Sequence, residues 1–109
     1  MDEIKLKALC DLITIQQIER LKADGLDCAG NIDNALTVYI IKSKYTYINI
    51  GSSGKYMIDN STGNIYGIKA YGVIHRGHCY GNLDTIQNYY WGRYTAFKKE
   101  GITWQKKTL

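Results

Sequence analysis

The sequence predicts an α+β fold in which an N-terminal helical segment packs on a small antiparallel β-meander. Three observations support this prediction: a helical pattern in the first thirty residues, a strand pattern from residue 36 onward, and turns rich in Gly, Asn and Ser between the strands. A chain of 109 residues is long enough to bury one core. We therefore expect a single domain over residues 1–109.

The N-terminal segment has the caps and the apolar spacing of a helix. Asp2 is placed to cap its start, and Gly25 is placed to end it. Its apolar residues fall on two faces about 130° apart: Leu6, Leu9, Cys10 and Ile13, then Ile15, Ile18 and Leu21. The stretch "TIQQ" at 14–17 has the form of a capping box. The pattern predicts either one bent helix or, as we favour, two short helices that meet near Thr14.

Two stretches that are rich in β-branched and aromatic residues begin the meander, "LTVYIIK" at 36–42 and "KYTYINI" at 44–50. The second alternates polar or aromatic residues with Thr46, Ile48 and Ile50, which is typical of a strand with one buried face. The turn "GSSG" at 51–54 then leads into "KYMID". The pattern predicts three consecutive strands.

The meander is expected to continue through the turn "NSTG" at 60–63 into "NIYGIKA". Further on, "NLDTIQNYYW" at 82–91 predicts a short helix with Asn82 as its cap, and "RYTAFKK" at 93–99 predicts a last strand. The run Tyr89, Tyr90 and Trp91 is expected to expose aromatic surface, which often marks a contact between subunits. We therefore expect a homo-oligomer.

The composition favours a soluble cytoplasmic protein. The longest apolar runs are too short to cross a bilayer, and the N-terminus lacks the apolar stretch of a signal peptide. Cys10, Cys28 and Cys79 are an odd, widely spaced set and do not form a disulfide framework. We expect all three to be small buried hydrophobic residues.

Charge is distributed unevenly along the chain. Residues 1–54 carry six Lys or Arg and seven Asp or Glu, whereas residues 55–109 carry eight and three. All ten tyrosines and eight of the eleven glycines lie between residues 39 and 94. A ligand is therefore expected to bind the second half and to be an anion.

Metal binding and catalysis receive little support from the segment "GIKAYGVIHRGHCYG" at 67–81. His75, His78 and Cys79 lie close together in sequence, but a zinc site also needs a second, spaced pair of ligands. His78 and Cys79 are adjacent, and adjacent residues of a strand point to opposite faces. We expect no metal, no cofactor and no catalytic residue.

A phosphate loop at "GSSGKY", residues 51–56, is also disfavoured. The Walker pattern requires Gly where Asn49 stands and Ser or Thr where Tyr56 stands. The segment joins two strands and opens no helix, so it lacks the helix N-terminus that binds phosphate. It is interpreted as a hairpin turn from which Lys55 could still reach an anion.

Anion recognition fits the 67–81 segment best. Glycines let the backbone approach a ligand, Tyr rings stack on bases, and Arg76 offers a fork for phosphate. The alternative interpretation is that Tyr and Gly only fill and bend a small sheet. The residues predicted to bind the ligand are Lys69, Tyr71, His75, Arg76, His78, Tyr80, Asn82 and Arg93.

Residues 51–86 carry a resemblance to small proteins of phages and prophages, through the pieces "SGKYMID", "IYGIKAYG" and "HRGH.YGNLDTI". The segment resembles the first family of Thoeris anti-defence proteins. The resemblance implies a small, cytosolic, non-enzymatic oligomer that has an N-terminal helix before a sheet. It also implies nucleotide pockets between subunits that sequester a cyclic ADP-ribose signal.

The function expected from these observations is phage counter-defence by sequestration of a cyclic nucleotide-type signal without hydrolysis. Two alternatives stay open. One is an inhibitor that binds a host protein or nucleic acid through the same basic, aromatic surface. The other is a small enzyme on nucleotides or ADP-ribose, with His75 or His78 as its acid or base.

Overall fold

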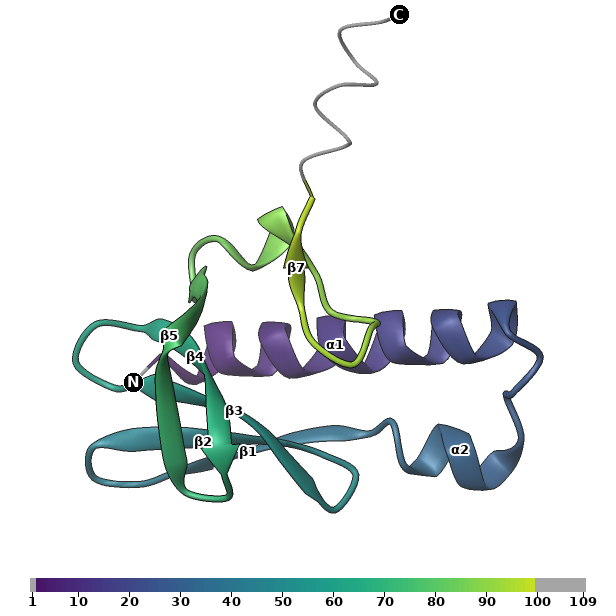
Figure 1. Ribbon diagram of the computed structural model, residues 1–109, viewed down its shortest axis with the longest axis horizontal. Coiled ribbons are helices and arrows are strands. Elements are labelled where there is room, and N and C mark those ends of the chain that lie inside the picture. Colours follow the sequence, from purple (N-terminus) through teal and green to yellow (C-terminus); the bar gives the residue numbers. More distant parts are fainter. Residues whose placement is uncertain (1, 100–109) are drawn as a thin grey trace, which may run out of the picture.

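The computed structural model describes residues 2–99 and confirms the α+β class. One long helix precedes a five-stranded antiparallel sheet with strand order β1-β2-β3-β4-β5, and a two-stranded sheet of β6 and β7 follows. The elements are α1 (Glu3–Ala23), α2 (Ala29–Asp33), β1 (Thr37–Ile41), β2 (Tyr45–Ile50), β3 (Ser53–Asp59), β4 (Asn64–Ala70), β5 (Val73–Asn82), the 3-10 helix η1 (Ile86–Asn88), β6 (Tyr89–Tyr90) and β7 (Phe97–Lys98). In Figure 1, α1 and the β1–β2 hairpin run along the long axis, and β4 and β5 cross them steeply.

Helix α1 is continuous, so the predicted break near Thr14 is wrong. Asp2 caps its start as expected, because its Oδ1 accepts the backbone N–H groups of Ile4 and Lys5 at 3.0 and 3.2 Å. The "TIQQ" side chains do not cap anything. The Thr14 hydroxyl accepts the Thr37 N–H at 3.0 Å, and Gln17 Nε2 donates to the Trp91 carbonyl at 2.7 Å.

The apolar faces of α1 differ in their burial. Leu6, Leu9, Cys10 and Ile13 are buried as predicted. On the second face Leu21 is buried, but Ile18 is only partly covered and Ile15 is 55% exposed. Gly25 ends the helix with φ +70°, and the Leu26 N–H donates to the Leu21 carbonyl at 2.8 Å. A straight helix therefore buries one face on the sheet and leaves Ile15 in solvent.

The sheet follows the predicted alternation. In β2, Thr46, Ile48 and Ile50 are buried beneath α1, whereas Tyr45 and Tyr47 lie on the opposite face and are half-buried. The turns that join β2–β3, β3–β4 and β4–β5 each contain a glycine with φ between +60° and +79°, a conformation that other residues rarely adopt. They are Gly51, Gly63 and Gly72. The face that packs under α1 is called the covered face below, and its opposite is called the outer face.

Strand β5 departs from a regular ladder at the point that the sequence singled out. The consecutive residues Tyr66 and Gly67 of β4 pair with Cys79 and His75 of β5. Arg76, Gly77 and His78 consequently bulge out of the ladder. Because of this bulge, the side chains of Arg76 and His78 are not held to the alternation of a regular strand.

The C-terminal part packs on the covered face beside α1. The predicted helix at 82–91 shortens to the 3-10 turn η1, whose preceding residue is Thr85, so Asn82 is not its cap. Of the predicted strand at 93–99, only Phe97 and Lys98 are extended into β7. The tail from residue 100 onward lies outside the described residues.

Trp91 is fully buried, which contradicts the prediction that the aromatic run 89–91 is exposed. Its indole Nε1 donates to the Ile86 carbonyl at 3.0 Å, and its backbone N–H donates to Gln16 Oε1 at 2.7 Å. The ring packs edge-on against Tyr56 with centroids 5.3 Å apart. Trp91 therefore joins the C-terminal segment to both α1 and the sheet, while Tyr89 and Tyr90 stay half-buried.

In the described part of the chain, neither α-helix has the length and apolar character needed to cross a bilayer.

Candidate functional site

The structure divides the predicted ligand-binding residues between the two faces of the sheet. Arg76 and Tyr71 contact residues of the outer face. His78 and Tyr80 line a cavity on the covered face, and Arg93 lines a larger cavity beside it. The predicted set is therefore not one site.

Arg76 binds within the protein. Its guanidinium donates to the Tyr45 hydroxyl at 2.6 Å and lies 3.9 Å from the Asp59 carboxylate. It also lies over the Tyr66 ring, 5.3 Å from the centroid. The Tyr45 hydrogen bond is the main cause that raises the pKa of Arg76. These partners weaken the prediction that Arg76 grips a ligand phosphate in a cleft.

Tyr71 and Lys69 belong to the tip of the β4–β5 hairpin. The Tyr71 ring packs edge-on against Tyr47 with centroids 5.4 Å apart, and its hydroxyl accepts from Asn49 Nδ2 at 3.4 Å. Lys69 is exposed at the end of β4. Neither residue lines the cavities described below.

The two histidines stack on each other across the β5 bulge. Their ring centroids are 4.1 Å apart with an interplanar angle of 18°. A Cβ at Gly77 would lie 3.0 Å from Cε1 of His75, so the glycine makes room for this stack. Gly77 therefore serves packing within the protein, as the alternative interpretation of the glycines supposed.

Asn82 is used in the turn that follows β5. Its Oδ1 accepts the Asp84 N–H at 2.8 Å, and its own N–H donates to Thr85 Oγ1 at 3.0 Å. Gly81 beside it has φ +71°. The polar atoms of Asn82 thus stabilise the turn in which the chain leaves the sheet.

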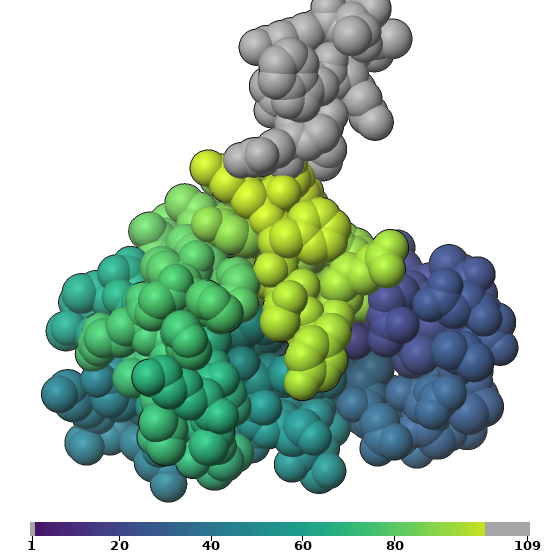
Figure 2. Space-filling view, in the orientation of Figure 1, coloured from purple at the N-terminus to yellow at the C-terminus, as the bar shows by residue number. Residues whose placement is uncertain are grey.

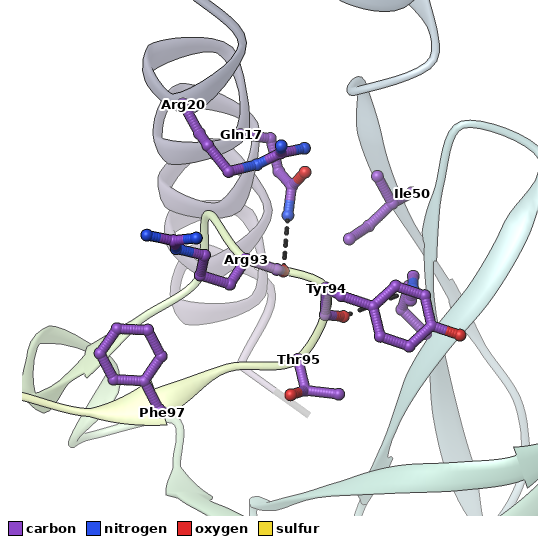
Figure 3. Close-up of a pocket in the computed structure, with 8 residues that line it drawn as sticks. Gln17, Arg20, Ile50, Arg93, Tyr94, Thr95 and Phe97 are labelled. Atoms are coloured by element: carbon purple, nitrogen blue, oxygen red, sulfur yellow. Dashed lines mark hydrogen bonds between the residues drawn. The ribbon is translucent and has the colours of Figure 1, made fainter. Parts of the chain in front are cut away.

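The larger cavity lies between α1, the β2–β3 hairpin and the loop that joins β6 to β7. Its volume is about 590 Å³, and three of its lining residues are cationic: Arg20, Lys55 and Arg93. No Asp or Glu among the described residues lines it. Figure 2 shows the loop as a projecting arm, and in Figure 3 Arg93 and Tyr94 leave it in opposite directions.

Helix α1 positions the loop through a polar strip. Gln17 Nε2 donates to the carbonyls of Trp91 and Arg93 at 2.7 and 3.3 Å. Arg20 Nε donates to the Gly92 carbonyl at 2.5 Å, and its Nη1 lies 3.4 Å from Asp24. These contacts attach the loop to α1, and Figure 3 shows the Gln17 side chain directed at the Arg93 carbonyl.

A β-bulge positions Lys55 at the wall of the larger cavity. Ile48 pairs with Tyr56 and Asn49 pairs with Gly54, so Lys55 has no ladder partner and is not held to the strand alternation. Its Nζ lies 3.6 Å from the centroid of the Tyr94 ring and 3.4 Å from the Tyr94 carbonyl. Partial burial lowers the pKa of Lys55. A cation that loses water without gaining a carboxylate is a favourable partner for an anion.

The smaller cavity, of about 130 Å³, lies next to the larger one. Lys55, Tyr94 and Thr95 line both cavities. Tyr80 forms part of its lining and packs edge-on against Tyr56 with centroids 5.4 Å apart. Burial raises the pKa of Tyr80, so its hydroxyl is neutral at physiological pH and can act as a hydrogen-bond donor. His78 also lines the smaller cavity, which is therefore both polar and aromatic.

We define the candidate site as these two joined cavities. It includes three of the eight predicted residues, namely His78, Tyr80 and Arg93. The sequence indicated Lys55 only as an isolated cation, and it gave no indication of Arg20. The spacing of Gln16, Gln17 and Arg20 on one side of α1 was the available signal, because a polar strip beside a buried face needs partners.

Among residues 2–99, no three His, Cys, Asp or Glu side chains gather into a group that could hold a metal ion. The prediction that all three cysteines are buried is wrong. Cys10 is buried on the core-facing side of α1, whereas Cys28 and Cys79 are exposed. Cys79 lies just after the β5 bulge, where its thiol contacts the Gly81 carbonyl at 3.6 Å.

No protein-family model matches the chain, and neither a curated protein nor a solved structure is significantly similar to it. The resemblance over residues 51–86 therefore stays a prediction.

Proposed function

We propose that the protein binds a small phosphorylated molecule of nucleotide type in the joined cavities and holds it without converting it. The observation that carries the proposal is the lining of the larger cavity, which holds three cations and no described Asp or Glu. Of these cations only Arg20 pairs with an acid, Asp24, which does not line the cavity. Its volume of about 590 Å³ is within the usual range for small-molecule sites. Guanidinium and ammonium groups are the common protein ligands of phosphate.

The smaller cavity supports the nucleotide part of the proposal. Tyr80 offers an aromatic ring and a neutral hydroxyl, and His78 offers an imidazole. Because Lys55 and Tyr94 line both cavities, one ligand can place its phosphates near Arg93 and its base near Tyr80. Such a ligand would make charged contacts at one end and stacking contacts at the other.

The biological role proposed for this binding is phage counter-defence through sequestration of a cyclic ADP-ribose-like immune signal. The resemblance over residues 51–86 supports this role. Sequestration requires tight binding and a rigid site, and it requires no catalytic group. The loop anchors at Gln17 and Arg20 supply such rigidity.

Calorimetry with cyclic ADP-ribose isomers, ADP-ribose, cyclic dinucleotides and pyrophosphate tests the proposal. We expect at least one of the nucleotides to bind with one saturable site per chain and to be recovered intact after the protein is denatured. Recovery of a cleaved product would instead favour the enzyme. Absence of heat for every compound would refute the binding function.

Arg93→Gln is the informative variant, because Arg93 is exposed and its loss should leave folding intact. Removing a charged hydrogen-bond donor to phosphate should weaken nucleotide binding about 10-fold or more. Lys22→Gln removes the same charge from an exposed position on α1 and is the matched control. Equal weakening by both variants would show that the cavity is not the site.

A further inference from the structure

The outer face of the sheet carries a second group of aromatic and cationic side chains. Tyr45 and Tyr47 of β2 and Tyr66 of β4 lie on it, and Tyr71 packs on Tyr47 from the hairpin tip. Lys42 and Lys44 flank it in the β1–β2 turn. None of these six residues lines the joined cavities of the candidate site. They are called the outer aromatic face below.

Cations lie over the rings of this face. Lys42 Nζ is 5.3 Å from the centroid of Tyr47, and Lys44 Nζ is 5.6 Å from that of Tyr45. The Arg76 guanidinium carbon lies 5.3 Å from the centroid of Tyr66 and 5.8 Å from that of Tyr45. Tyr45, Tyr47 and Tyr66 thus each have a positive charge within reach of a phosphate attached to a group stacked on the ring.

The acid beside this face is already engaged. Asp59 accepts the Ser61 N–H and hydroxyl at 2.9 and 2.7 Å, and it lies 3.9 Å from Arg76. Lys42, Lys44 and Arg76 therefore leave a net positive charge. A second copy of the chain fits poorly where a two-fold contact is centred on Lys42 and Lys44, because each copy would present the same positive charges to the other.

The outer aromatic face also stays accessible. Tyr71 is 57% exposed, and the neighbouring Val38 and Ile40 of β1 are exposed on the same side of the sheet. Stacking on Tyr rings is open to any base that is not already stacked, and cations between the rings can follow a phosphate chain. A duplex hides its bases, so it would use the cations but not the rings.

We infer that the outer aromatic face binds single-stranded nucleic acid, with bases on the tyrosines and phosphates on Lys42, Lys44 and Arg76. The binding is independent of sequence, because every base has an aromatic face. It uses a surface separate from the joined cavities, so it adds to the proposed small-molecule function and does not depend on it.

Fluorescence anisotropy of labelled oligo(dT) and oligo(rU), each about 12 nucleotides long, tests the inference with the full chain. Saturable binding is expected at about 50 mM salt, and the affinity should fall about 20-fold at about 200 mM, because three neutralised phosphates give a slope near −2. A duplex of equal length should bind more weakly. Tighter binding of the duplex, or no saturable binding to either strand, would overturn the inference.

Two variants separate stacking from charge. Tyr71→Leu keeps most of the apolar bulk against Tyr47 and should weaken oligonucleotide binding about 5-fold or more. Lys42→Gln with Lys44→Gln should reduce the salt slope by about 1.4. Lys22→Gln and Arg93→Gln are controls in α1 and in the larger cavity, and each should leave oligonucleotide binding unchanged.

The controls also decide between partners. If Lys22→Gln weakens binding as much as removal of one outer-face lysine, the attraction is a general effect of net charge and the inference is wrong. If Arg93→Gln abolishes oligonucleotide binding, the phosphates enter the cavity instead, which again overturns it. Binding of polyglutamate in place of oligonucleotides would assign the outer aromatic face to an acidic protein.

Discussion

On the covered face of the sheet the cations line a cavity that no described Asp or Glu lines, whereas on the outer face they lie over aromatic rings beside Asp59. Lys55 reaches the larger cavity because a bulge frees it from the ladder. Arg76 also leaves its ladder at a bulge, yet it meets Tyr45, Tyr66 and Asp59. Similar backbone irregularities therefore yield two different surfaces, according to whether a carboxylate lies within reach of the cation.

The two faces therefore differ in which cations are available to a ligand. Arg76 already donates to a hydroxyl and lies near a carboxylate, so a phosphate would share the guanidinium with these partners and bind the N–H groups that they leave free. Lys55 and Arg93 meet no described carboxylate, so a phosphate would not compete with an acid for either of them. A basic residue in a glycine-rich segment is thus weaker evidence for an anion site than a basic residue without an acid.

The largest loss of stability is expected when Trp91, in the core on the covered face, is replaced. Trp91→Ala should lower the free energy of unfolding by about 3–5 kcal/mol, because it removes a fully buried ring and leaves a cavity. Urea denaturation measures this change. Tyr94→Ala is the control, since Tyr94 is 82% exposed and its loss should cost less than about 1 kcal/mol. Equal losses for both variants would show that Trp91 does not anchor the C-terminal segment.

A smaller effect is expected on the outer face, where Met57 is the buried residue. Met57 pairs with Tyr47 and Tyr66 in the ladder and is 2% exposed. Met57→Ala should cost about 2–4 kcal/mol in urea denaturation, whereas Met57→Leu, which conserves volume, should cost less than about 1.5 kcal/mol. A loss near zero for Met57→Ala would mean that the outer face has no packed layer of its own.

The meander was predictable because its signal is local. The alternation in residues 44–50 specifies which side chains are buried, and the glycines at 51, 63 and 72 mark turns that need positive φ. The continuous α1 was not predictable from "TIQQ", because the partners of Thr14 and Gln17 are 23 and 74 residues away. Distant partners of this kind leave no periodic trace in the sequence.

The candidate site was predictable only in part for the same reason. Arg20, Lys55 and Arg93 come from a helix, a strand bulge and a loop, which tertiary packing brings together. In β5, His75 stacks on His78 across a three-residue bulge, and no propensity scale describes such a stack. The alternative interpretation of the 67–81 segment, that its glycines bend a small sheet, agrees with the irregular β5. The sequence did not show which face each side chain would join.

The smallest expected effect concerns the Asp59 carboxylate beside Arg76 on the outer face. Its pKa is lowered, first by the Ser61 hydroxyl, then by the Ser61 N–H, with a smaller contribution from the charge of Arg76. A lowered pKa means that the ionised group stabilises the fold above its unfolded pKa of about 3.9. That contribution is lost as the pH falls through the folded pKa.

The urea midpoint of the wild type should therefore exceed that of Asp59→Asn at neutral pH, and the difference between the two midpoints should narrow as the pH falls below about 4. Asp33→Asn, at an exposed acid of α2, gives the background shift for loss of a carboxylate. If the difference between the two urea midpoints instead widens at low pH, the ionised carboxylate opposes folding. The Asp59–Ser61 hydrogen bonds would then not be the cause of the lowered pKa.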